Sequence, residues 1–249
     1  PPIDSPEGVK YVFEKAKKTG IDVFPIACVT KGMKGQELCD YDALKAAGVT
    51  AISDDGRPVE NAELMRQAIE KTNENGLIVT SHCEDLKIIN GGIINKGDIS
   101  EKLGVKGMDR ASEDYITARE ICLAMSCNAR VHICHVSTKG SVNIIRAAKK
   151  DGVKVTCETA PHYFTFTDEK LLARDADFRM SPPLRRTGRL LRKLFLTALS
   201  TASSPTTLHT PQRKRLTLRK LQTVLWDLKL PLQLRLQSFI TVASAVLTR

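Results

Sequence analysis

The sequence predicts an α/β fold, a partial (β/α)8 barrel of the TIM type that contains about five βα units. Short runs of β-branched and apolar residues alternate with amphipathic helical patterns, an order typical of a parallel sheet with helices outside it. Three of these runs are followed by a residue that can bind a metal ion, and βα-barrel enzymes carry their active sites at the carboxyl ends of the strands. Five units are too few to close an eight-stranded barrel.

Helix and strand patterns follow one another through the first 185 residues. The predicted helices cover residues 6–19, 41–47, 61–75, 112–127 and 137–150. Gly20, Gly48 and Gly76 stand where C-caps are expected. The predicted strands cover residues 21–29, 49–53, 77–81, 130–134 and 153–158, and residues 91–107 are predicted to form a glycine-rich loop.

Charge divides the chain into two parts. The 249 residues carry a net charge of +10, but residues 1–185 hold 26 Lys and Arg against 27 Asp and Glu. Residues 186–249 hold 12 basic residues and a single acid, Asp227. We predict a partial metal-dependent hydrolase barrel over residues 1–185, and we predict that the basic tail over residues 186–249 is not a native domain.

The cysteines favour a reducing compartment. All seven lie in the first part, and their spacing is neither that of a zinc ribbon nor that of a disulfide framework. No apolar run is long enough to cross a membrane, and no signal peptide is recognisable. We expect a cytoplasmic protein with reduced cysteines and no membrane partner.

Asp55, His82 and His135 are the candidate metal ligands, because each follows a predicted strand. Asp55 would also suit a turn, and either histidine could be a hydrogen-bonded core residue, but three such coincidences at strand ends favour a shared site. His132 is three residues from His135, so on a strand it should point to the other face and be structural. His162 is predicted to be a loop residue or a support for the ligands.

Five segments, taken in order, resemble the successive signatures of type I dihydroorotases, which are cyclic amidohydrolases of pyrimidine biosynthesis. The segments are Ser53-Asp54-Asp55-Gly56, Ser81-His82-Cys83-Glu84-Asp85, His132-Ile133-Cys134-His135-Val136-Ser137-Thr138, Glu158-Thr159-Ala160-Pro161-His162 and Met180-Ser181-Pro182-Pro183-Leu184-Arg185. The intervals of 27 and 53 residues between the three candidate ligands match the bacterial branch that uses an aspartate, where many relatives use a carboxylated lysine.

The resemblance implies a site with two zinc ions and a small-molecule substrate. Asp55 would bridge both ions, and His82 and His135 would bind the second. Zinc would activate a bridging water and polarise the amide carbonyl of dihydroorotate, giving N-carbamoyl-L-aspartate reversibly. Ser181 stands where the family usually has a substrate-contacting asparagine, so it is a candidate substrate-binding residue with a shorter reach. The resemblance also allows a homodimer.

Three parts of the family's site are expected to lie elsewhere. The resemblance places a His-x-His pair for the first zinc and an arginine for the substrate carboxylate before Pro1. It places the carboxylate that moves the proton after Arg185. We therefore expect the chain as printed to be an inactive fragment.

The sequence of the tail indicates that the reading frame changes near Arg186. From the junction of Ser204 and Pro205, shifting each codon by one base permits T-D-H-A-P-H-T-P-E-E-K-A-D-F-E-K-A-P-N-G-V-V-G-L-E-T-A-L-P, 29 consecutive positions in the style of the family's last-strand motif. The general acid-base aspartate would thus be encoded out of frame.

Other interpretations of the tail and of the whole chain stay open. A basic arm for nucleic acid would use Arg213-Lys214-Arg215 and Arg219-Lys220, and a membrane-binding helix would cover 216–236, but Pro231 interrupts it. We expect neither nucleic acid nor membrane as a partner. The alternatives for function are a dihydropyrimidinase, hydantoinase or allantoinase, and a non-catalytic amidohydrolase-like protein that acts through oligomer contacts.

Overall fold

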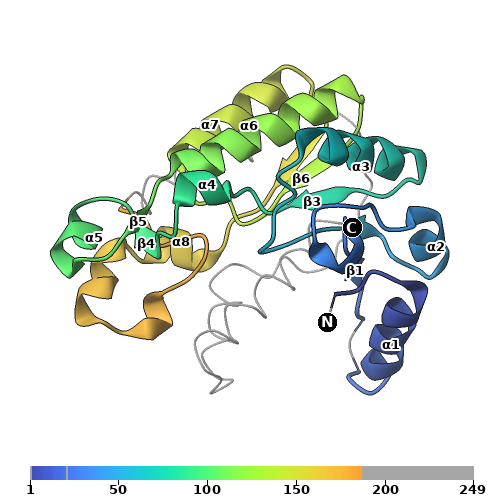
Figure 1. Ribbon diagram of the computed structural model, residues 1–249, viewed down its shortest axis with the longest axis horizontal. Coiled ribbons are helices and arrows are strands. Elements are labelled where there is room, and N and C mark those ends of the chain that lie inside the picture. The colour runs from blue at the N-terminus through green and yellow to red at the C-terminus, as the bar shows by residue number, and fades with distance from the viewer. Residues whose placement is uncertain (1, 21, 187–249) are drawn as a thin grey trace, which may run out of the picture.

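A computed structural model of the protein describes residues 2–20 and 22–186 (Figure 1). The basic tail predicted over residues 186–249 therefore lies, apart from its first residue, outside the described residues. The described part contains the whole segment that carries the candidate site.

A five-stranded parallel sheet lies at the centre of the described part, in the order β1-β2-β3-β6-β7. Its strands are β1 (Ile26–Ala27), β2 (Ala51–Ile52), β3 (Val79–Ser81), β6 (Val131–Ile133) and β7 (Val155–Cys157). All neighbouring strands are parallel, and their order in the sheet follows their order in the chain. This is the arrangement of one part of a βα-barrel wall, so the predicted fold class is confirmed.

Some of the helices in the described part cover one face of this sheet. The helices are α1 (Pro6–Ala16), α2 (Tyr41–Ala46), α3 (Ala62–Glu74), α4 (Leu86–Ile89), α5 (Asp98–Leu103), α6 (Ala111–Ser126), α7 (Lys139–Lys150) and α8 (Pro161–Thr165), with 3-10 turns at Lys31–Met33, Asp168–Ala173 and Ala176–Phe178. Figure 1 shows α3, α6 and α7 side by side along the sheet.

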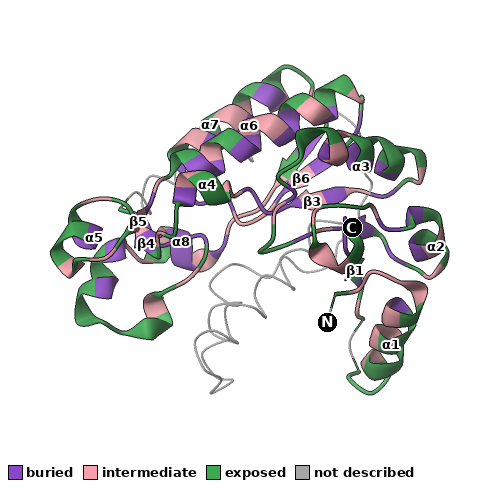
Figure 2. Ribbon diagram, viewed as in Figure 1, coloured by how far each residue is buried: buried purple, intermediate pink, exposed green. Residues whose placement is uncertain are grey.

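The core lies between these helices and the sheet. Ile52, Val79, Val131 and Val155 stand at the same level of neighbouring strands and are buried. Figure 2 shows the buried residues gathered along the sheet and the inner sides of the helices, with exposed residues on the outer sides. Side chains alternate between the two faces along each strand. The residue next to each of these buried ones therefore points to the opposite face of the sheet, which we call the inner face.

Local signals explain where the helices begin and end. Asn61 caps α3 by accepting from the N–H groups of Glu63 and Leu64 at 3.0 and 3.1 Å. α1 is shorter than predicted. It ends at Ala16, and its C-cap is Lys17 instead of the expected Gly20. The Thr19 hydroxyl donates to the Ala16 carbonyl at 2.8 Å and so satisfies an acceptor of the last turn.

The prediction of a glycine-rich loop over residues 91–107 is wrong, because this segment contains regular secondary structure. It contains α5 and a two-stranded parallel sheet made of β4 (Ile94–Asn95) and β5 (Gly107–Met108). Glycine serves close packing here, because a Cβ on Gly92 would lie 2.5 Å from the backbone carbonyl of Gly107. The predicted strands exist, but each is shorter than its sequence pattern.

Candidate metal centre

Asp55, His82 and His135 meet at the carboxyl end of the sheet. His82 Nδ1 lies 2.9 Å from Asp55 Oδ1 and 2.9 Å from His135 Nε2, and His135 Nε2 lies 3.4 Å from Asp55 Oδ1. These distances are well below the roughly 6 to 7 Å that sharing a zinc pair allows. The convergence that the sequence predicts is therefore observed, while the role of the three residues as metal ligands stays a prediction.

Asp54 fixes the turn that presents Asp55. Its buried carboxylate accepts from the N–H of Val29 at 2.8 Å and from the N–H and hydroxyl of Thr30 at 3.2 and 2.5 Å. The turn after β2 is thereby bound to the turn after β1. Asp55 points the other way and its side chain is 65% exposed, so the cluster is open on that side.

Glu84 orients His82. The imidazole is buried, and its Nε2 lies 3.2 Å from Glu84 Oε2, a carboxylate oxygen that accepts from it. Burial disfavours the charge on His82, but hydrogen bonds to Asp55 and Glu84 outweigh it and raise its pKa to about 9. Hydrogen bonds from His135, the larger effect, and from His82 hold the pKa of Asp55 well below its usual value. Nδ1 of His82 therefore faces the other two ligand atoms.

His135 has an unusual backbone conformation. Its φ of +36° lies in the left-handed region, which is costly for a residue with a side chain. It follows the end of β6 by two residues, so strand alternation does not decide where its side chain points. Such a conformation persists only where the surrounding structure enforces it, and the following residues are firmly held.

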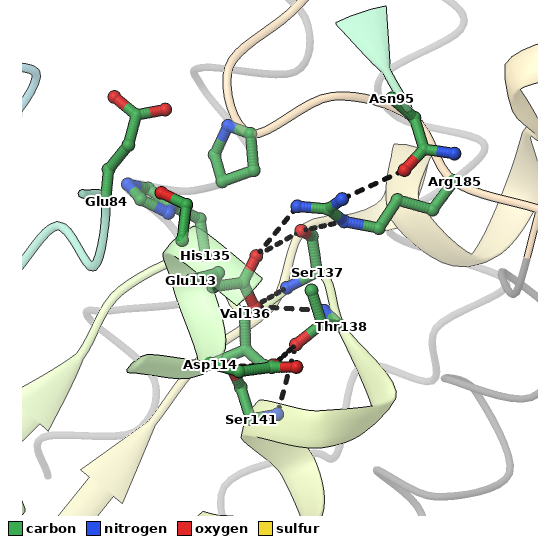
Figure 3. Close-up of polar contacts among 12 residues, drawn as sticks. Glu84, Asn95, Glu113, Asp114, His135, Val136, Ser137, Thr138, Ser141 and Arg185 are labelled. Carbon is green, nitrogen blue, oxygen red and sulfur yellow. Dashed lines mark hydrogen bonds and ion pairs between the residues drawn. The ribbon is translucent and has the colours of Figure 1, made fainter. Parts of the chain in front are cut away.

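A buried carboxylate, Glu113 of α6, holds the segment after His135 (Figure 3). Glu113 accepts from the N–H groups of Ser137 and Thr138 at 2.8 and 2.9 Å and from the Ser137 hydroxyl. Arg185 donates to Ser137 Oγ at 2.9 Å and lies 3.4 Å from Glu113. This network ties the His135 loop to α6 and to the last residues of the described chain.

Ser181, the predicted substrate-binding residue, lies beside the site. Its hydroxyl donates to Glu84 Oε1 at 3.2 Å, so it is joined to His82 through that carboxylate. Burial alone would raise the pKa of Glu84, but the hydrogen bond from His82 prevails and lowers it. Glu84 is a member of the site that the sequence reasoning missed, although its position two residues after His82 was a usable signal.

His162 and His132 contribute no atom to the cluster of three candidate ligands. His162 is the second residue of α8, is buried, and packs its ring against Tyr163 with centroids 4.0 Å apart. Neither of its ring nitrogens has a hydrogen-bond partner in the described structure, and burial lowers its pKa to about 4. His132 lies on β6 and contacts Thr156 of β7.

The donor set fits a divalent metal ion. Ligand bonds of about 2.0 to 2.1 Å in tetrahedral geometry place neighbouring ligand atoms about 3.3 to 3.4 Å apart. The observed 2.9 to 3.4 Å triangle is close to that arrangement. A carboxylate on the second ring nitrogen of a metal-binding histidine, as Glu84 provides for His82, is the usual support for such a ligand.

Comparison with known proteins assigns the family. The family model described as dihydro-orotase-like matches residues 3–141. The chain belongs to the dihydroorotase-like family. A dihydroorotase of Citrifermentans bemidjiense is 52% identical over 186 residues, and one of Geobacter metallireducens is 49% identical over 183 residues. These matches cover 74% and 73% of the chain but only 44% and 43% of the relatives, so the chain spans less than half of their length.

Solved structures show the same fold. A dihydropyrimidinase from Brevibacillus agri has a TM-score of 0.59 at 22% identity, covering 74% of this chain and 43% of its own. A D-hydantoinase has a TM-score of 0.62 at 19% identity, covering 80% of this chain and 45% of its own. At this identity the likeness concerns the fold alone.

Two other features bear on the expected site and compartment. A cavity of about 590 Å³ beside β4 and α5 is lined by Asn95, Asp98 and Arg185 among others, and none of the three candidate ligands lines it. In the described residues all seven cysteines are free thiols. No helix of the described part is long and apolar enough to cross a membrane.

Proposed function

We propose that this chain carries part of the binuclear zinc site of a dihydroorotase, the enzyme that interconverts dihydroorotate and N-carbamoyl-L-aspartate. The observation that carries the proposal is the convergence of Asp55, His82 and His135 within 3.4 Å at strand ends. The family assignment gives this cluster its chemical context.

Zinc is the metal we propose for this cluster. Two imidazoles and one carboxylate form a ligand set that suits zinc and leaves positions for water and substrate. Magnesium and calcium are usually bound by oxygen atoms alone. Asp55, which is exposed on one side, would bridge to a second ion, as the resemblance implies.

The residues of the chain prepare the site for ring opening. Zinc, when bound, supplies a Lewis acid and a water of lowered pKa. Glu84 accepts from Nε2 of His82, so Nδ1 would be the nitrogen that gives up its proton and binds the metal. Ser181 offers a hydroxyl beside Glu84 for a polar group of the substrate. His162, neutral at physiological pH, adds no positive charge near the metal.

We propose that the whole protein acts on a small cyclic amide. The free cysteines support a cytoplasmic enzyme. The homodimer is proposed from the family resemblance alone. The alternative is a hydantoinase or dihydropyrimidinase, the titles of the matching structures. An aspartate and not a lysine at position 55 favours the dihydroorotase branch. About 50% identity to dihydroorotases supports the same choice.

A chimaeric enzyme tests the proposal. Residues 2–185 of this chain replace the matching segment of the Citrifermentans bemidjiense dihydroorotase, and turnover is measured with dihydroorotate, hydantoin and allantoin. We expect zinc-dependent turnover that favours dihydroorotate and is abolished by His82→Gln. Faster hydantoin turnover would show that the branch is wrong, and full activity of the His82→Gln chimaera would show that the ligands are wrong.

The same assay is applied to the 249-residue chain by itself. We expect no measurable turnover from it, because the proton-transferring carboxylate is proposed to be encoded out of frame, and losing such a group costs about 10² to 10⁴ in rate. Turnover of dihydroorotate by the printed chain would contradict that part of the proposal.

A further inference from the structure

A second group of metal-binding side chains lies on the inner face of the sheet. Val131 and Ile133 of β6 are fully buried on the side of the helices. His132, between them, therefore points to the inner face, and Cys134 follows on the same side by alternation. His132 thus has surroundings different from those of His135, the predicted ligand three residues further on.

Glu158 extends the group from the neighbouring strand. In β7, Thr156 is paired with His132, and the ladder continues beyond the strand ends. The N–H of Glu158 donates to the Ile133 carbonyl at 3.0 Å, and the N–H of Val136 donates to the Glu158 carbonyl at 2.8 Å. Glu158 is therefore held level with Cys134 by two backbone hydrogen bonds.

The three donor atoms lie close enough together to share one metal ion. One ligand atom each from His132, Cys134 and Glu158 lies within 4.8 Å of the others. His132 Nε2 is 3.7 Å from Glu158 Oε2, which is too long for a direct hydrogen bond. Two ligands of one tetrahedral zinc ion, with bonds of about 2.0 to 2.3 Å, lie roughly 3.3 to 3.8 Å apart.

Thr156 orients the histidine of this group. Its Oγ1 lies 2.8 Å from His132 Nδ1, and this contact fixes the plane of the ring. The other nitrogen, Nε2, then faces Glu158 and the Cys134 side. Metal-binding histidines commonly have one ring nitrogen held by a polar group in this way while the other binds the ion.

We propose that His132, Cys134 and Glu158 form a second, thiolate-containing binding site for a zinc-like divalent ion on the inner face of the sheet. Imidazole, thiolate and carboxylate are all zinc ligands, and the sulfur favours zinc or cobalt over magnesium or calcium. The site differs from the Asp55, His82 and His135 cluster in one testable respect, because only the inner-face site contains sulfur.

Cobalt(II) titration of the full chain separates the two sites. A cobalt–thiolate bond gives a charge-transfer absorption band in the near ultraviolet, which nitrogen and oxygen ligands do not give. We expect this band to appear on cobalt addition and to be lost in Cys134→Ser and in His132→Gln. It should be retained in His82→Gln, which disables the other cluster, and in Cys122→Ser, which removes the exposed cysteine of α6.

Several outcomes would overturn the proposal. The absence of the band, or its survival in Cys134→Ser, would show that the thiol binds no metal and that His132 and Glu158 form an ion pair only. Loss of the band in His82→Gln together with its survival in His132→Gln would assign the sulfur to the first cluster. Far-ultraviolet circular dichroism checks that each variant keeps the wild-type fold.

Cysteine alkylation in the His82→Gln chain tests the inner-face site without any substitution in that site. The rate of alkylation of each cysteine is followed by mass spectrometry with and without zinc. We expect zinc to slow alkylation of Cys134 selectively and to leave Cys122 unchanged. Equal rates for Cys134 with and without zinc would contradict the proposed site.

Discussion

Replacing Glu113 by glutamine should destabilise the described fold strongly, although the chemical change is small. Glu113→Gln keeps the size and shape of the side chain. It also keeps one carbonyl oxygen, which can still accept from the N–H groups of Ser137 and Thr138. The amide NH2 then replaces the oxygen that accepts from the Ser137 hydroxyl and faces Arg185.

The magnitude follows from the burial of the pair. The side chains of Arg185 and Glu113 are 8% and 6% exposed, so the guanidinium would lose its charged partner away from water. Removing one member of a buried ion pair costs about 3 to 5 kcal/mol. The guanidinium also donates to Asn95 Oδ1 at 3.0 Å, which keeps part of its solvation. We therefore expect the free energy of unfolding to fall by about 3 kcal/mol.

Urea unfolding followed by far-ultraviolet circular dichroism measures this difference, with an unchanged m-value as the sign of a two-state comparison. Glu63→Gln is the matched control, because Glu63 pairs with Arg66 at 2.8 Å on the exposed side of α3. Exposed pairs of this kind contribute little to stability. A loss below about 1 kcal/mol for Glu113→Gln, equal to that of the control, would refute the reasoning from burial.

Three further predictions concern the site. Burial favours neutral His162, so wild type should lose stability as pH falls from 6.5 to about 4, whereas His162→Phe should not. The difference in the free energy of unfolding should grow by on the order of 2 to 3 kcal/mol over that range. Equal urea midpoints of the two proteins at pH 4 would contradict this. Glu84→Gln should weaken zinc affinity about 10- to 100-fold in a chelator competition, whereas an unchanged affinity would exclude an orienting role. Ser181→Asn in the chimaeric enzyme should lower KM for dihydroorotate, and an unchanged KM would remove position 181 from the substrate site.

The main features of the site were predictable because they follow from strand periodicity. Asp55, His82 and His135 each follow a short apolar run, and parallel strands bring their carboxyl ends to one edge. The sequence could not predict the left-handed backbone of His135, because that conformation depends on contacts far along the chain. Glu113 and Arg185 make such contacts with Ser137, two residues after His135.

Other features were missed for physical reasons. Glu113 lies in the first turn of α6, where an acidic residue is expected at the surface to interact with the helix dipole. Its burial follows only from the packing of the segment after β6. The β4 and β5 pair was missed because Gly92 and Gly107 are typical of a loop, whereas here they allow two backbones to approach closely.

The central claim is that Asp55, His82 and His135 bind zinc together, and zinc affinity tests it most directly. Zinc competition against a chelator is measured for the Cys134→Ser chain, in which the inner-face site cannot contribute a thiolate, and for the same chain carrying His82→Gln. The account predicts one zinc site in the first protein and an affinity at least about 100-fold weaker in the second, since a ligand is lost outright. Equal zinc affinities in the two proteins would contradict it.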